Sequence, residues 1–122
     1  MKISNLEFEQ IELDLSHREV FIKAVGIELR KLRKSYSLSG RELAGIMNVS
    51  QQQISRYECG VCAIPTDVLI IILGFFKITL FEFFKGVYLN AFDIDMNMVQ
   101  DKYYNVFISH WIIISAPEIK LI

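Results

Sequence analysis

Two helix-start signals lie close together in the middle of the chain, and their spacing limits what the chain can fold into. Ser39-Gly-Arg-Glu42 has the capping-box pattern, in which the serine and glutamate side chains bond to backbone amides of the first turn. Ser50-Gln-Gln-Gln53 repeats the pattern with glutamine. A helix that follows Ser39 must therefore end before Ser50, and Asn48 can end it because asparagine tolerates the left-handed conformation. We predict two short helices, at residues 40–47 and 51–58.

Three further helices are predicted on either side of this pair. Ser16 opens another capping box, followed by apolar residues at mostly helical spacing until residues 36–39. Pro65 suits the first turn of an apolar helix at 66–75, and Thr79 can cap a helix at 80–85 that Gly86 closes. Five short helices in fewer than 70 residues predict an all-α fold.

The three-residue turn between the two central helices is typical of a helix-turn-helix, in which the second helix enters the DNA major groove. The residues expected where the two helices meet are apolar or small, and Ala44 permits close approach. The second helix is expected to direct polar side chains outward. They are of the types that hydrogen-bond base edges, because glutamine pairs with adenine and arginine with guanine. These residues are Gln51, Gln52, Ser55 and Arg56.

Charge is unevenly distributed along the chain. The 122 residues carry a net charge of −1, yet residues 17–60 hold eight basic and four acidic residues, a net charge of +4. Acidic segments flank this part, at −3 for residues 1–16 and −2 for residues 61–122. Clustered basic residues suit a surface that contacts phosphate, although charge alone favours a solvated helix face.

Residues 38–44 and 49–60 resemble the phage-repressor-like (XRE-type) helix-turn-helix family. The resemblance covers residues 25–84 and implies the five-helix lambda-repressor-like fold. It implies base reading by the four outward residues named above and an ion pair between Arg33 and Glu58. It also implies phosphate contacts at helix N-termini. The residues expected to contact phosphate are Ser39, Gly40, Arg41 and Ser50, with Lys31 added as a nearby cation.

Residues 50–58 are most similar, within that family, to enterobacterial regulators encoded with fimbrial operons, which repress motility genes. Three positions depart from the family pattern. Asn48 replaces the usual turn glycine, and the loop at residues 59–64 lacks the lysine and asparagine that commonly contact phosphate there. The helix at 66–75 is apolar on all sides, which predicts burial on all sides.

The last third of the chain is the hardest part to interpret. Residues 103–115 are rich in β-branched and aromatic residues, which fits a buried helix or a strand, with a helix favoured. We expect an acidic arm at residues 1–17, a DNA-binding domain at 18–86 and a packing or dimerisation extension at 87–122. We expect the extension to pack on the helices at 66–75 and 80–85 or across a dimer. The residues expected at this extension or dimer contact are Ile70, Ile71, Phe75, Phe107 and Trp111.

Several other classes of protein are not supported. No glycine-rich phosphate loop, paired carboxylates or nucleophile–histidine–acid set indicates an enzyme, and no cofactor, metal site or small-molecule ligand is expected. The longest apolar stretch is too short to cross a membrane, and no signal peptide is apparent. Cys59 and Cys62 have redox-motif spacing but are better interpreted as two free thiols in a cytoplasmic protein.

Together these features predict a DNA-binding transcription regulator, a repressor that binds a palindromic operator in double-stranded DNA as a homodimer. The alternative is a protein-interaction module on a helix-turn-helix fold, such as an antitoxin or an anti-repressor. The uncharged loop at residues 59–64 and the apolar helix at 66–75 favour this alternative, whereas the net positive charge of residues 17–60 opposes it.

Overall fold

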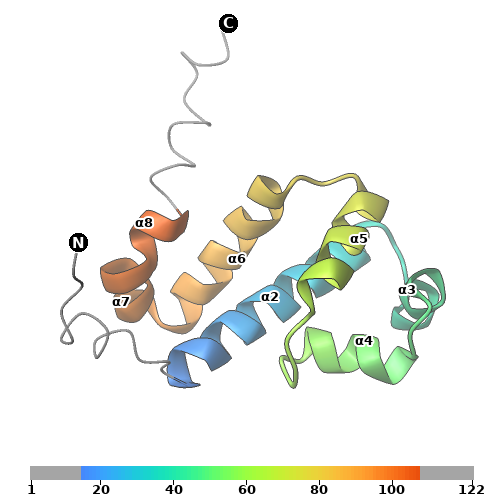
Figure 1. Cartoon of the computed structure of the whole chain (residues 1–122), viewed down its shortest axis with the longest axis horizontal. Helices are drawn as coiled ribbons and strands as arrows, with labels where there is room; N and C mark the ends of the chain where they lie inside the picture. Colours follow the sequence, from blue (N-terminus) through green and yellow to red (C-terminus); the bar gives the residue numbers. More distant parts are fainter. Residues whose placement is uncertain (1–14, 108–122) are drawn as a thin grey trace, which may run out of the picture.

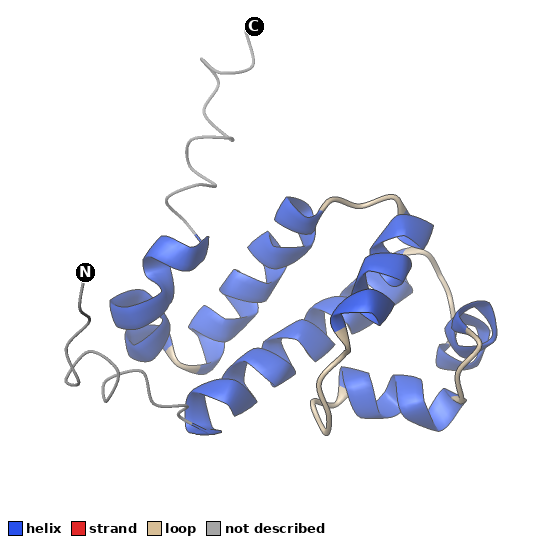
Figure 2. Ribbon diagram, in the orientation of Figure 1, coloured by secondary structure: helices blue, strands red, loops and turns tan. Residues whose placement is uncertain are grey.

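The computed structural model describes residues 15–107, and every regular element in this range is helical (Figures 1 and 2). The all-α fold predicted from the sequence is therefore confirmed for this part of the chain. The elements are α2 (Leu15–Ser35), α3 (Gly40–Met47), α4 (Gln51–Glu58), α5 (Thr66–Phe76), α6 (Leu80–Ile94), α7 (Met96–Met98), the π-helix η1 (Val99–Tyr103) and α8 (Tyr104–Phe107).

Helices α2 and α6 run antiparallel along most of their lengths and form the centre of the molecule (Figure 1). Asn90 of α6 lies between them with 4% of its surface exposed. Its amide nitrogen donates to the Ala24 carbonyl and to the Glu28 carboxylate, both at 3.0 Å, and its oxygen accepts from Lys31 at 2.9 Å. The buried amide is thus fully paired, as a polar group in a core must be.

Two clusters of buried side chains form the core. One joins α2, α5, α6 and η1, and includes Ala24, Phe83 and Val99. The other joins the end of α2 to α3, α4 and α5, and includes Leu43 and Ile54. Leu32, Ile64 and Ile78 pack against both clusters, so the helix pair α3–α4 is connected to the rest of the molecule through shared apolar contacts.

Three predicted helix boundaries differ from the structure. Helix α2 already includes Leu15, so Ser16 lies inside it and is not its N-cap. Helix α5 ends one residue later than predicted, at Phe76, where Lys77 takes the left-handed conformation at φ 57°. Helix α6 does not end at Gly86 but continues to Ile94. The glycine costs about 1 kcal/mol in helix propensity, but the turns that follow it bury Val87, Tyr88 and Ala91 against the core.

The described part of the extension packs on α2 and α6. The rings of Tyr103 and Phe107 contact Phe21 of α2, with ring centres 4.8 and 5.9 Å away, and Phe107 also contacts Tyr88 of α6. Residues 104–107 are helical, as favoured from the sequence. Residues 108–115, and with them Trp111, lie outside the described residues.

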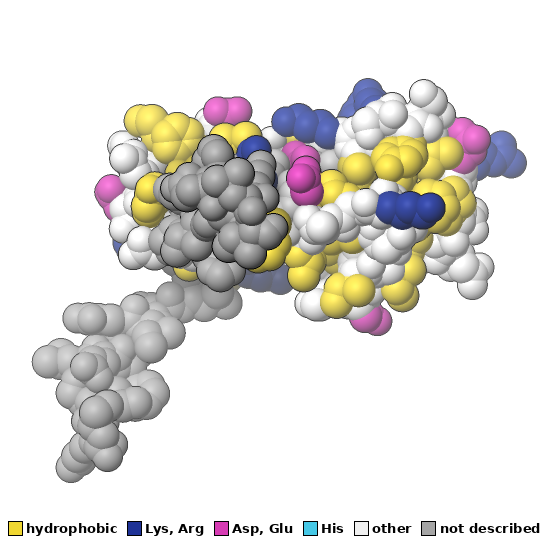
Figure 3. Space-filling model, turned by 90° about the horizontal axis from the view of Figure 1, so that it is seen from above, with side chains coloured by type: hydrophobic (Ala, Val, Ile, Leu, Met, Phe, Trp, Pro, Cys, Tyr) yellow, Lys and Arg dark blue, Asp and Glu magenta, His cyan; other side chains and the backbone are white. Residues whose placement is uncertain are grey.

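The outer face of α5 is exposed among the described residues of this single chain, so the predicted burial on all sides requires a cover that these residues do not supply. Ile70, Ile71 and Phe75 are 55%, 60% and 45% exposed. In Figure 3 hydrophobic side chains gather at the end of the molecule that holds α5 and the start of α6. The described extension contributes Val99 to the core cluster that contains the inner face of α5, but Ile70, Ile71 and Phe75 on the outer face stay exposed. Within residues 15–107 no helix is long and apolar enough to cross a membrane.

Candidate nucleic-acid interface

Helix α3 is fixed at both ends by bonds that involve its own neighbours in sequence. The Ser39 hydroxyl accepts from the Glu42 amide at 3.0 Å, and the Glu42 carboxylate accepts from the Ser39 amide at 2.9 Å. The pKa of Glu42 is lowered below its ordinary value, mainly because the carboxylate accepts from the Ser39 backbone amide and to a smaller extent because it interacts with the Ser39 side chain. At the other end Asn48 has φ 56°, the left-handed conformation that its sequence position predicts.

Helix α4 follows after three residues and packs across α3. Ser50 caps it by accepting from the Gln53 amide at 3.0 Å. The reciprocal half of the predicted capping box is absent, because the Gln53 side chain instead donates to the Cys62 sulfur at 3.3 Å. Ile54 and Tyr57 are buried in the same cluster as Leu43 and Ala44, as the sequence pattern predicts.

The outward face of α4 carries the four residues predicted to read bases, and the structure places all four on the exposed surface. They are Gln51, Gln52, Ser55 and Arg56. The turn that follows α4 contains Gly60, whose φ of 71° is left-handed and whose Cα lies against the Lys23 side chain.

Gly26 of α2 allows α4 to approach α2 closely. A Cβ atom at this position would collide with the carbonyl oxygen of Tyr57 and would lie 2.8 Å from that of Glu58. Both atoms belong to the backbone of α4, so they cannot move without moving the helix. No sequence pattern indicated that this glycine lies at the contact between α2 and α4, because the contact joins segments about thirty residues apart in the chain.

An ion pair fixes the far end of α4 to α2. Arg33 donates to both carboxylate oxygens of Glu58, at 2.7 and 2.9 Å, and to the Leu38 carbonyl at 2.7 Å. The two side chains are 11% and 5% exposed, and the hydrogen bond to Glu58 raises the pKa of Arg33. One guanidinium thus connects α2, the α2–α3 loop and α4, which holds α4 in a defined position against α2.

The residues expected to contact phosphate do not all lie together. Ser39 and Arg41 are exposed at the start of α3, Gly40 is half-buried there, and Ser50 is exposed before α4. Lys31 lies on another face of α2, where it donates to Asn90 of α6.

The neighbouring residue, Arg30, instead lines a shallow hollow with Gly40, Gln51 and Ser55. Successive residues of a helix are about 100° apart, so adjacent cations can face different partners. The clustering of bases in the sequence indicated a cation in this region but could not distinguish Arg30 from Lys31.

The two cysteines lie in the loop that follows α4. Cys59 is exposed, Cys62 is half-buried, and both are free thiols. Among the described residues no group of three or more histidine, cysteine, aspartate or glutamate side chains could hold a metal ion.

Residues 29–83 match the family model whose description is helix-turn-helix. This range begins within α2 and ends within α6, so it contains the α3–α4 pair and the helices that hold it. Residues 29–83 are a helix-turn-helix domain. The helix-turn-helix is a DNA-binding fold, and the lambda-repressor-like architecture expected from the sequence is confirmed.

Two curated relatives are similar to the helix-turn-helix domain. The antitoxin PezA of Streptococcus pneumoniae serotype 4 is 33% identical over 55 residues, which are 45% of this chain and 35% of PezA. A Pyrococcus furiosus protein named "Putative HTH-type transcriptional regulatory protein PF1851" is 40% identical over 50 residues, 41% of this chain and 16% of that protein. The chain thus aligns with about a third of the first relative and a sixth of the second. No solved structure is significantly similar to the chain.

Proposed function

We propose that the protein is a sequence-specific DNA-binding transcription regulator that inserts α4 into the major groove. The observation that carries this proposal is the outward face of α4. Its exposed glutamine and arginine side chains are the types that read adenine and guanine. They stand on a helix whose position is fixed by the Arg33–Glu58 pair, so binding to bases does not require the backbone of α4 to become ordered.

In this proposal phosphate contacts orient the domain on the duplex, and base contacts supply specificity. Ser39, Gly40, Arg41 and Ser50 lie at two helix N-termini, which favour anions. Arg30 adds a cation beside Gln51 and Ser55. We retain Lys31 as a weaker candidate, because a phosphate contact would have to compete with its bond to Asn90.

The proposed regulator acts as a homodimer on a palindromic operator, with half-sites about 34 Å apart or a multiple of this. The exposed apolar side chains of α5 supply a surface for a second copy. Repression by occupying the operator, and the link to fimbrial and motility genes, rest on the sequence resemblance of residues 50–58. Mapping the bound sites in the source genome would test that link.

The proposal is tested by selection from a random DNA duplex pool at near-physiological salt, with Arg56→Ala and Lys34→Ala run in parallel. We expect the unmodified protein to enrich a pseudo-palindromic sequence. Arg56→Ala should lose about 1–3 kcal/mol of discrimination at one base pair. Lys34→Ala, which removes an exposed charge that no base contact requires, should enrich the same sequence. Enrichment of no sequence by the folded protein would contradict the proposal.

A second candidate function is a protein-interaction module, an antitoxin-like protein that binds a partner through an apolar surface. Two observations favour it: the similarity to the antitoxin PezA and the exposed apolar face of α5. Salt dependence separates the two functions, because DNA binding weakens steeply with salt whereas an apolar protein interface does not.

A further inference from the structure

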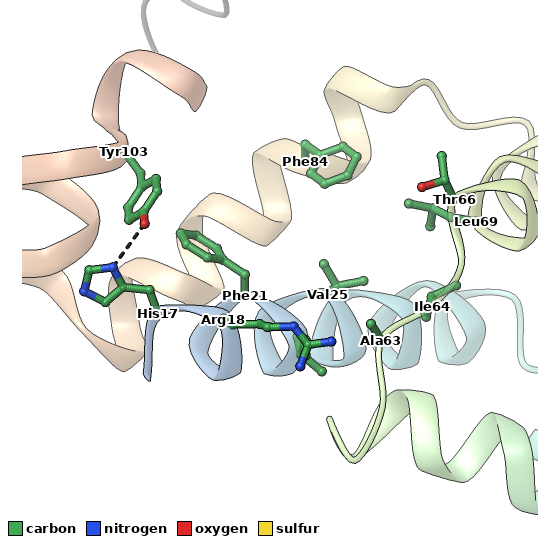
Figure 4. Close-up of a pocket in the computed structure, with 11 residues that line it drawn as sticks. His17, Arg18, Phe21, Val25, Ala63, Ile64, Thr66, Leu69, Phe84 and Tyr103 are labelled. Carbon is green, nitrogen blue, oxygen red and sulfur yellow. Dashed lines mark hydrogen bonds between the residues drawn. The ribbon is translucent and has the colours of Figure 1, made fainter. Parts of the chain in front are cut away.

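A groove of about 490 Å³ lies along the first half of α2 (Figure 4). Its volume is within the ~300–1,000 Å³ typical of small-molecule sites. Phe21 and Val25 of α2 form its floor, Phe84 of α6 lies opposite, and Ile64 and Leu69 close the side nearest α5. Thr66 contributes one hydroxyl to this part of the groove, and the other side chains named here offer no hydrogen bond, so a ligand that fills the groove needs a largely hydrocarbon body.

The polar groups of the groove favour an anion. Among the described residues, Arg18 and His17 are the basic side chains that line the groove, and the His17 ring nitrogen and the Tyr103 hydroxyl lie 3.0 Å apart (Figure 4). Among residues 15–107, no aspartate or glutamate lines the groove. A carboxylate near Arg18 would therefore meet a guanidinium, which binds carboxylates with charge-assisted hydrogen bonds, and none of the described lining residues is a carboxylate that would oppose it.

We propose that this groove binds a medium-chain fatty acid, with the carboxylate on Arg18 and the hydrocarbon chain between Phe21 and Phe84. The groove combines one cationic side chain with an apolar wall long enough to reach from α2 to the α4–α5 loop. This pairing matches a ligand that has one charged end and no other polar atom. The site is separate from the outward face of α4 and was not expected from the sequence.

The position of the groove connects it to α4. Ile64 belongs to the loop that joins α4 to α5, and its side chain packs against both core clusters. A fatty acid in contact with Ile64 stabilises one arrangement of this loop relative to α2, so its occupancy changes the DNA affinity. This consequence rests on the proposed function, whereas binding of the fatty acid does not.

The test is calorimetric titration of the full chain with decanoate, below the concentration at which decanoate forms micelles, and with decanol as an uncharged probe. We expect saturable binding of decanoate. Arg18→Gln should weaken it about tenfold, the effect of one partly exposed charge-assisted hydrogen bond, and should leave decanol affinity unchanged. Lys34→Gln removes the same charge elsewhere on α2 and should leave both affinities unchanged.

A second variant tests the apolar part of the groove. Ala63 is exposed and lines the groove, so Ala63→Trp can fill it from the surface without entering a core cluster. We expect this variant to melt near the temperature of the unmodified protein and to lose both decanoate and decanol binding. Ile71→Ser, on the exposed face of α5, should bind both probes normally.

Three results would overturn the proposal: no saturable binding of decanoate, an equal loss in Arg18→Gln and Lys34→Gln, or normal binding in Ala63→Trp. The coupling is measured separately, as the affinity for selected DNA with and without decanoate. We expect a change of about threefold or more, and no change would refute the coupling. If no DNA is bound, the titrations without DNA still decide whether the groove binds fatty acids.

Discussion

Helices α4 and α5 are consecutive, and they present opposite kinds of surface to solvent. Both bury apolar side chains in the same cluster, Ile54 and Tyr57 from α4 and Ile72 and Phe76 from α5. On their outer faces α4 exposes glutamine, serine and arginine, whereas α5 exposes Ile70, Ile71 and Phe75. The buried faces alone would not distinguish a DNA-contacting helix from a protein-contacting one.

The outer faces differ in what each gains by contact. The polar side chains of α4 are hydrated when free and exchange water for base edges at little net cost, so they give specificity more than affinity. Burying the apolar side chains of α5 in a contact contributes about 25 cal/mol of favourable free energy for each Å² of apolar surface removed from water. These differences support the proposal that α4 contacts DNA and that α5 contacts a second copy of the chain. The following predictions test this contrast, from the largest expected effect to the smallest.

Breaking the ion pair that holds α4 should have the largest effect on stability. Arg33→Met leaves the 5%-exposed Glu58 carboxylate without its charged partner, and we expect a loss of about 3 kcal/mol in the free energy of unfolding. Chemical denaturation at neutral pH measures it. Lys34→Met, an exposed neighbour on the same helix, should change stability by less than about 0.5 kcal/mol. Equal effects of the two variants would show that the pair does not hold α4.

Adding a methyl group at Gly26 should push α4 away from α2. The Cβ would meet two backbone carbonyls of α4, so Gly26→Ala should lower the free energy of unfolding by about 2 kcal/mol. It should also weaken DNA binding, because α4 is displaced from α2. Gly45→Ala in α3 is the matched control, because no atom lies within 4 Å of its Cβ position. That variant should gain about 0.5–1 kcal/mol from better helix propensity. Thermal unfolding measures both variants. If Gly26→Ala and Gly45→Ala both raised the melting temperature, the close approach of α2 and α4 at Gly26 would be contradicted.

The α5 face is tested by its effect on association. Ile71 is 60% exposed, so Ile71→Ser should leave the stability of a monomer nearly unchanged but weaken dimerisation at least tenfold, about 1.4 kcal/mol. Sedimentation over a range of concentrations measures it. Leu89→Ser, at 51% exposure on α6, should leave dimerisation unchanged. A chain that is monomeric at all concentrations would refute the dimer.

The α3 capping box predicts a smaller effect with a defined pH dependence. Ser39→Ala should lower the free energy of unfolding by about 1 kcal/mol, because it removes the N-cap of α3. Because the Glu42 pKa is lowered in the folded state, its carboxylate stabilises the fold above the unfolded-state pKa of about 4.5, and this stabilisation disappears as pH falls through the lower folded-state pKa. Glu42→Gln should therefore be less stable than the unmodified protein at pH 7 and equal to it in strong acid. A difference that persists in strong acid would exclude the carboxylate as its cause.

The smallest expected effect separates two adjacent cations. Arg30→Ala should weaken DNA binding evenly across sequences and reduce the slope of log affinity against log salt by about 0.9, the value for one phosphate contact. Lys31→Ala should have less effect on the slope, because the ammonium bonds to Asn90. The reverse order would restore Lys31 as the phosphate contact.

Local signals in the sequence were sufficient to predict the α3–α4 end of the molecule. The caps at Ser39 and Ser50 and the turn at Asn48 depend on atoms within a few residues of one another. The alternation of buried and exposed residues on α4 follows from helical geometry alone. At Gly86 the same local reasoning was wrong, because burial of the following turns outweighs the weak helix propensity of glycine.

By itself the sequence determined the all-α fold, the turn between α3 and α4 and the identity of the outward residues of α4, because each depends on spacing along one helix or turn. Only the tertiary structure decided that Gly26 brings α2 against α4 and that Lys31 bonds to α6 while Arg30 faces the interface. It also decided that helices, a loop and η1 together form an apolar groove with one cationic side. These features depend on contacts between residues that are far apart in the chain. Such contacts are set by the packing of the helices and leave no pattern within any one segment.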